Sequence, residues 1–338
     1  MRRYLSLAFI LFAQLTLAQQ FKLKDIKTEV NSSFRGLSVV NDQVAWVSGS
    51  DGWVGISTDG GNQWNFNQVK GHESSGFRSL YAFDETKAII ANAGAPANIL
   101  LTLDAGKTWK VVYTNYNEAS FFDGMDFWNK NEGLIYGDPI NGKMLLLKTT
   151  DGGNTWAEVL NAPSLQEGEA SFAASGTGIR CIGKDKAIIS TGGLVSRLWT
   201  TTNKGETWSD MSPPIVQGKA TTGIFSFAVD KNNIILVGGD YKNPSLATAH
   251  NLYSNDNGLT WITPSAPSRG YRECVEFLTD KILLTTGPTG TDISNDKGVT
   301  WGAFSEAEGF HTLRKARKGV LTIIAGDNGQ IGIIKKKK

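Results

Sequence analysis

Short runs of apolar and β-branched residues recur along the chain in groups of four, and each run is bounded by polar turns. The first group occupies residues 34–40, 44–48, 53–58 and 64–69. The same order of runs fits five further segments, at residues 77–113, 122–160, 177–211, 223–263 and 271–304. Runs of this length with turn signals between them predict an all-β chain built from four-stranded units.

A last group starts at Phe310, continues through residues 320–325 and 330–334, and lacks its fourth strand. Residues 21–28 form a β-like run that belongs to no group. We therefore predict a seven-bladed β-propeller in one domain, residues 19–338, whose last blade is completed by this N-terminal strand. At about 46 residues per blade, the spacing lies near the ~40–50 of four-stranded propeller repeats. Closing the ring also protects the first and last blades from edge pairing.

One motif, Ser/Thr-x-Asp-x-Gly-x-Thr-Trp, recurs with small variations six times, at residues 57–64, 102–109, 149–156, 201–208, 254–261 and 294–301. Its short acidic side chain can accept hydrogen bonds from the backbone of its own turn, and its glycine supplies a positive φ. The tryptophan then begins a strand and offers a large face for packing between neighbouring sheets. Asn203 replaces the aspartate in the fourth copy, because the turn needs an acceptor rather than a charge. We assign these motifs a structural role only.

The motif resembles the Asp-box, or BNR repeat, which is specific for β-propellers but not for function. The whole pattern, with Phe34-Arg35-Gly36-Leu37 opening the first blade, resembles photosystem II stability and assembly factor-like propellers. That resemblance implies a non-catalytic protein that binds another protein, with an arginine patch as a contact surface.

Residues 1–18 combine Arg2 and Arg3, a short apolar run and a small residue before Gln19, which predicts a cleaved signal peptide and a secreted or periplasmic protein. The formal net charge is +2, and both leader arginines would be removed, so the mature chain is near neutral and is not expected to bind nucleic acid. No later apolar segment is long enough to predict a membrane span. Cys181 and Cys274 fall on inner strands of non-adjacent blades, which favours two buried free thiols over a disulfide.

In a four-stranded blade the Asp box lies between strands three and four, so the starts of the inner strands lie on the opposite face of the propeller. Aligning the repeats on their second strands gives one equivalent position at each of these starts, occupied by Arg35, Arg78, Asp123, Thr177, Ile224, Arg272 and His311. Three of the eight mature arginines share this position. The sequence thus predicts a basic arc of Arg272, His311, Arg35 and Arg78 on four adjacent blades, suited to an anionic partner.

The turns after the second strands carry acids that could pair with this arc: Asp51, Asp138, Asp240 and Asp327. If Asp51 and Asp327 held Arg35 and His311 in closed pairs, the arc would be structural. We include Asp123, Asp138, Asp240 and Asp327 with the arc as candidate binding residues. The three histidines lie on non-adjacent blades, so neither a metal nor another cofactor is predicted.

The favoured function is an exported, monomeric, non-catalytic scaffold that binds a protein or another anionic partner through the face opposite the boxes. The alternative is a sialidase-like or other glycoside hydrolase, because sialidases also combine Asp-box propellers with three arginines. A hydrolase would need paired carboxylates, or a tyrosine with a carboxylate. Tyr271 and Glu273 are the available pair, but strand alternation is expected to turn both away from the side that Arg272 faces. We therefore assign no catalytic residue.

Overall fold

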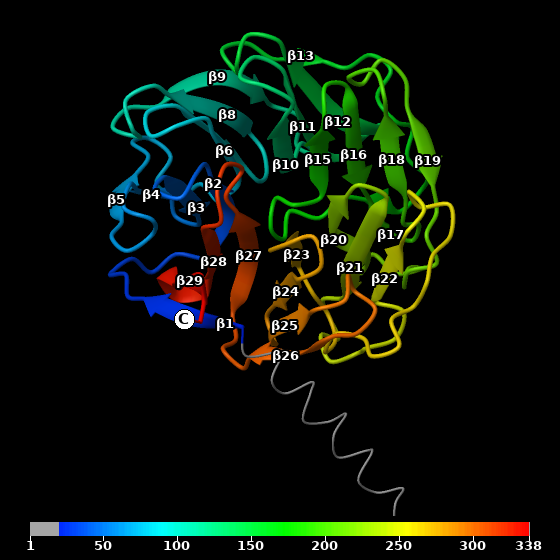
Figure 1. Cartoon of the computed structure of the whole chain (residues 1–338). Helices are drawn as coiled ribbons and strands as arrows, with labels where there is room; N and C mark the ends of the chain where they lie inside the picture. The colour runs from blue at the N-terminus through cyan, green and yellow to red at the C-terminus, as the bar shows by residue number, and fades with distance from the viewer. Residues whose placement is uncertain (1–19, 338) are drawn as a thin grey trace, which may run out of the picture.

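The structure, a computed structural model, describes residues 20–337. Seven antiparallel sheets form a ring of blades around a central axis (Figure 1). The seven-bladed propeller predicted from the sequence is confirmed. The leader predicted for residues 1–18 lies outside the described residues. Within the described part of the chain, no helix is long and apolar enough to cross a membrane.

Each blade begins at the axis and runs outward. The inner strands are β2 (Phe34–Val39), β6 (Phe77–Ala82), β10 (Phe122–Phe127), β15 (Ile179–Ile182), β20 (Thr222–Asp230), β23 (Cys274–Phe277) and β27 (Phe310–Lys315). The second strands are β3 (Ala45–Gly49), β7 (Ala88–Asn92), β11 (Gly133–Ile140), β16 (Lys186–Ser190), β21 (Asn233–Asp240), β24 (Leu283–Gly287) and β28 (Thr322–Gly326).

The third strands are β4 (Trp53–Ser57), β8 (Ala97–Thr102), β12 (Lys143–Thr149), β18 (Leu198–Thr201), β22 (Asn251–Ser254), β25 (Gly290–Ser294) and β29 (Ile331–Lys336). The outer strands are β5 (Asn65–Gln68), β9 (Lys110–Asn115), β13 (Ala157–Glu158), β19 (Ser209–Met211), β26 (Gly302–Ser305) and, in blade 7, β1 (Phe21–Ile26). In blade 5 the outer strand is reduced to a bridge between Tyr253 and Ile262. Two short strands, β14 (Glu169–Ala170) and β17 (Gly192–Gly193), extend this sheet on its inner side.

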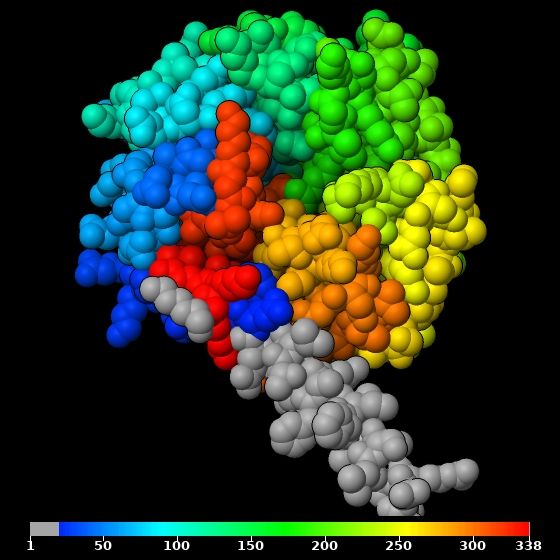
Figure 2. Space-filling view, in the orientation of Figure 1, coloured from blue at the N-terminus to red at the C-terminus, as the bar shows by residue number. Residues whose placement is uncertain are grey.

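The N-terminal strand closes the ring, as predicted. Strand β1 pairs with β29 from Phe21 opposite Lys336 to Ile26 opposite Ile331. In Figure 2 the blue residues that begin the described chain lie against the red residues near its end. Among residues 20–337 the one helical element is a 3₁₀ turn, η1 (Asp327–Gly329), between β28 and β29.

The hydrophobic core is divided into layers between neighbouring blades. Trp46 of blade 1 is fully buried and packs in one cluster with Phe77 and Ile90 of blade 2. Tyr136 of blade 3 clusters in the same way with Trp199 of blade 4. Because each layer joins two sheets, burial of apolar surface holds adjacent blades at fixed orientations.

The six Asp boxes are turns in which side-chain and backbone polar groups form hydrogen bonds with one another. In the second box the Asp104 carboxylate accepts from the Thr108 backbone N–H at 2.9 Å and from the Thr108 hydroxyl at 2.6 Å. Asn203 uses its side-chain oxygen in the same way, accepting from the Thr207 N–H at 3.0 Å. The box also donates to the turn between the first two strands of its blade, for example from Ala105 N to Thr86 O at 3.0 Å. The boxes and these inner turns therefore lie on one face of the propeller.

Replacing Asp151 by alanine is expected to lower the free energy of unfolding by about 1 kcal/mol, because a lost turn acceptor costs on that order. Asp151 accepts from the Thr155 N–H at 3.0 Å and from the Thr149 hydroxyl at 2.9 Å. Asp151→Asn keeps an acceptor, as Asn203 already does, and is the matched control. Urea unfolding of both variants measures the difference, and equal loss in both would contradict the turn-acceptor role.

Candidate functional site

The start of the inner strand carries a β-bulge in most blades, and the bulged residue does not pair with the second strand. The register shifts place this bulge at Arg35, Arg78, Asp123, Phe225 and His311. In blade 6 both Glu273 and Cys274 oppose Thr286, because the Glu273 N–H donates to Thr286 O at 2.8 Å and Cys274 is the register partner of Thr286. Glu273 therefore takes the bulged position of blade 6.

The predicted arc is wrong at Arg272. This side chain is completely buried and donates from Nε to the Asp292 carboxylate at 2.9 Å. The Tyr271-Arg272 pair imitates Phe34-Arg35 in sequence, but the Tyr271 N–H donates to Pro244 O, outside the sheet. The inner strand of blade 6 therefore begins one residue later than its alignment with blade 1 predicts. The same displacement in blade 5 puts Phe225, and not Ile224, at the bulge.

Glu273 lies at the centre of a buried polar network, so the expectation that it faces away from the arc is also wrong. Its carboxylate contacts His311 Nδ1 at 2.5 Å, accepts from the Tyr271 hydroxyl at 3.0 Å and lies 3.4 Å from Arg35 Nη1. His311 Nε2 lies 2.9 Å from the Asp327 carboxylate. His311 is thus held in a closed pair with Asp327, whereas Arg35 pairs with Glu273 instead of Asp51.

Arg78 is the least satisfied cation of the arc. Its guanidinium forms no hydrogen bond or ion pair within residues 20–337, and its Cζ lies 5.9 Å from the centre of the Phe121 ring. Burial, and next the positive charge of Arg35, lower the pKa of Arg78, while Asp123 and Glu273 oppose this shift. Arg35 and Arg78 therefore lie close enough to repel each other.

The predicted acids differ in their surroundings. Asp123 is completely buried, and neither carboxylate oxygen has a hydrogen-bond partner in the described chain. Burial raises the pKa of Asp123 well above its usual value, and the nearby charge of Asp138 adds to this. Burial also raises the pKa of Asp138, although the carboxylate accepts from the Ser171 N–H at 2.9 Å.

Asp240 is not linked to this cluster. Its carboxylate accepts from the Lys242 N–H at 3.0 Å and lies 3.7 Å from the exposed Lys219 ammonium. Across residues 20–337, no group of three or more histidine, cysteine, aspartate or glutamate side chains is placed to hold a metal ion. Cys181 and Cys274 are both free thiols, as predicted, but only Cys274 is fully buried.

A segment of blade 4, residues 174–176, crosses the axis and forms a plug; no sequence signal pointed to it. Ala174 O accepts from Arg35 Nη1 at 2.8 Å, and the Ser175 hydroxyl donates to Glu273 O at 2.7 Å. Gly176 O accepts from Arg314 Nη2 at 2.8 Å. The plug therefore binds blades 1, 6 and 7 and separates the arc from the part of the channel near the boxes.

The family described as Photosynthesis system II assembly factor YCF48 matches residues 92–226 of the chain. The chain is thus similar to photosystem II assembly factor-like propellers. This confirms the resemblance that the repeats indicate. No curated protein matches the chain by sequence.

Solved structures show the same fold at low sequence identity. A YCF48 bound to D1 peptide has a TM-score of 0.66 at 14% identity, covering 94% of this chain and 97% of that one. The YCF48 from Cyanidioschyzon merolae has a TM-score of 0.67 at 14% identity, covering 92% and 98%. The GH74 enzyme from Niastella koreensis has a TM-score of 0.61 at 14% identity, and the match covers 93% of this chain but 53% of the enzyme.

Proposed function

We propose that this protein is an exported, non-catalytic scaffold that binds an acidic segment of another protein at the channel mouth opposite the boxes. Arg78 carries the proposal: its guanidinium is half-buried and has no ion pair among residues 20–337, so its N–H donors are available to a ligand. Such a fork matches a carboxylate in two places. Arg35 lies beside it and adds a second positive charge.

The charge balance at this mouth favours an anion. Glu273 is shared by Arg35 and His311, and Asp327 contacts His311, so among residues 20–337 neither acid forms an ion pair with Arg78. The raised pKa of Asp123 favours its neutral form, which weakens the nearest compensation further. The similar propeller described as YCF48 bound to D1 peptide binds a peptide, and this supports a peptide partner over an anionic sugar.

A labelled peptide of alternating aspartate and alanine tests the proposal by fluorescence anisotropy with the mature chain. Arg78→Gln is expected to weaken binding by about tenfold or more, since a charge-assisted hydrogen bond contributes about that factor. The matched control is Lys184→Gln, which removes one exposed charge elsewhere and should bind as the wild type does. Binding should also weaken with salt, because exposed charges are screened beyond about 8 Å at physiological ionic strength. Equal affinity in both variants would refute the proposal.

The hydrolase alternative has one observation in its favour, the hydrogen bond between the Tyr271 hydroxyl and Glu273. Tyr271 is only 2% exposed, however, and burial raises its pKa well above the usual value. A nucleophilic tyrosine needs access to the sugar and an accessible phenolate. The binding function is therefore better supported, and cleavage of sialosides that Glu273→Gln abolishes would reverse that preference.

A further inference from the structure

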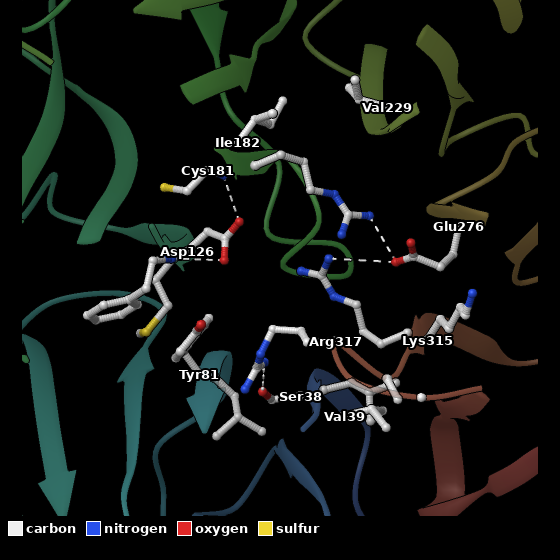
Figure 3. A pocket seen from close by; sticks show the side chains of 18 residues that line it. Ser38, Val39, Tyr81, Asp126, Cys181, Ile182, Val229, Glu276, Lys315 and Arg317 are labelled. Carbon is white, nitrogen blue, oxygen red and sulfur yellow. Dashed lines mark hydrogen bonds and ion pairs between the residues drawn. The ribbon is translucent and has the colours of Figure 1, made fainter. Parts of the chain in front are cut away.

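A second cationic cavity lies on the other side of the plug. It encloses about 420 Å³ and is lined by the ends of the inner strands, among them residues 37–39, 125–127, 180–182 and 314–317. These ends lead into the turns that contact the Asp boxes, so the cavity opens on the box face. Figure 3 shows Tyr81, Asp126, Cys181, Glu276 and Arg317 around a common space.

The charges that line this cavity do not balance. Four cations, Arg180, Arg314, Lys315 and Arg317, share it with two acids, Asp126 and Glu276. The Asp126 carboxylate is already used by backbone donors, accepting from the Cys181 N–H at 2.7 Å and the Phe127 N–H at 2.9 Å. With four cations against two acids, the lining carries an excess of two positive charges.

The Glu276 carboxylate is shared by two guanidinium groups. It lies 3.1 Å from Arg180 Nη2 and 3.9 Å from Arg314 Nη1. Burial, and next the charge of Arg180, lower the pKa of Arg314 to about 10. An anion beside Arg314 would relieve this repulsion in the low-dielectric surroundings of the channel.

Two further cations of the lining make no ion pair with any other residue from 20 to 337. Arg317 stacks on the Tyr81 ring at 4.4 Å and donates to the Ser38 hydroxyl at 2.9 Å and to Ala82 O. The Lys315 ammonium makes no hydrogen bond or ion pair with any residue from 20 to 337. Burial raises the pKa of Tyr81 to about 12, so its hydroxyl stays protonated and can donate to an anion.

We propose that this cavity binds a small organic dicarboxylate, with one carboxylate at Arg314 and the other at Arg317. Two guanidinium groups suit two carboxylates, and the net excess of two cations matches a dianion. Apolar residues of the lining, including Leu80, Met125 and Ile182, suit a hydrocarbon body. The site is independent of the proposed peptide site, because the plug lies between the two.

Isothermal titration calorimetry of the mature chain with phthalate, at constant ionic strength, tests this proposal. Benzoate has the same ring with one charge, and inorganic phosphate has the charge without the ring. We expect saturable one-to-one binding of phthalate, with benzoate and phosphate each weaker by about tenfold or more. Phosphate binding as tightly as phthalate would overturn the dicarboxylate assignment, and absence of saturable heat with all three probes would overturn the site.

Arg317→Gln is expected to weaken phthalate binding by about tenfold or more, because it removes a charged anchor. The matched control is Lys318→Gln, because Lys318 follows Arg317 in the sequence, is exposed and does not line the cavity. This variant should bind phthalate as the wild type does. Lys315→Gln is a second variant, expected to weaken binding in case Arg317→Gln is poorly folded by its melting curve. Arg78→Gln should leave phthalate binding unchanged. Wild-type affinity in both cavity variants, or loss in Lys318→Gln, would refute the proposal.

Discussion

The Asp292→Asn variant is expected to lose about 3–5 kcal/mol of its free energy of unfolding, which is the usual cost of removing one partner from a buried ion pair. The Arg272 and Asp292 side chains are 0% and 1% exposed, and their ion pair at 2.5 Å is the most deeply buried of those between residues 20 and 337. Asparagine keeps the shape and one acceptor oxygen but removes the negative charge that compensates Arg272, whose other acceptors, Tyr271 O and the Thr289 hydroxyl, are neutral.

Urea unfolding measures this loss, and Asp280→Asn is the matched control because Asp280 is exposed on the surface. A change below about 1 kcal/mol in Asp292→Asn would show that neutral acceptors suffice for Arg272. The buried ion pair with Asp292 keeps the Arg272 side chain away from the proposed peptide site. An Arg272→Ala variant should lose stability, so reduced binding in it would not report on the channel mouth.

The fold was predictable because the repeat is long and its physical constraints are local. The box needs an acceptor, a positive φ and a tryptophan, and Asp104, Gly106 and Trp109 supply them within a few residues. The missing strand after Ile334 and the unassigned run at residues 21–28 then fixed the closure. Only this closure joins segments far apart in the chain, and counting the strands of each blade was enough to predict it.

The site was harder to predict because the inner strand of blade 6 begins one residue later than the sequence alignment implies. The aromatic-arginine pairs at Phe34-Arg35 and Tyr271-Arg272 look alike, but Tyr271 packs against Phe225 with ring centres 4.7 Å apart and leaves the inner strand. Because of this displacement, Glu273 and not Arg272 lies at the channel mouth. Alternation of side chains along a strand makes such an error reverse every assignment in that blade.

One sequence signal could have corrected this. The turn after each inner strand often has a side chain that accepts from the backbone two or three residues later, as Asn41, Asp84, Asn129 and Thr279 do. In blades 1 to 3 the turn residues Asn41, Asp84 and Asn129 lie the same number of residues after the bulged residues Arg35, Arg78 and Asp123. Counting the same number of residues back from Thr279 gives Glu273. The plug carries no such signal, because its contacts with blades 1, 6 and 7 join segments far apart in the chain.

Replacing Asp123 by asparagine is expected to raise the free energy of unfolding at pH 7. The Asp123 carboxyl group is fully buried, and neither of its oxygens has a hydrogen-bond partner among residues 20–337. Its pKa in the folded chain is raised well above the usual 3.8, first by burial and then by Asp138. The folded protein therefore holds this proton more tightly than the unfolded chain does. The associated stability is present below pH 3.8 and is lost as the pH rises through the folded pKa.

Asparagine does not titrate, so Asp123→Asn should escape this loss. We expect the variant and the wild type to differ little near pH 4, and the variant to be more stable by about 1 kcal/mol or more at pH 7, the scale of an unsatisfied buried polar group. Urea unfolding at both pH values gives the difference, with Asp280→Asn again correcting for loss of one negative charge. A gain at pH 7 would mean that the chain keeps a destabilising acid beside Arg78, as binding sites often do at the expense of stability. A difference that is the same at both pH values would instead show that Asp123 does not titrate between them.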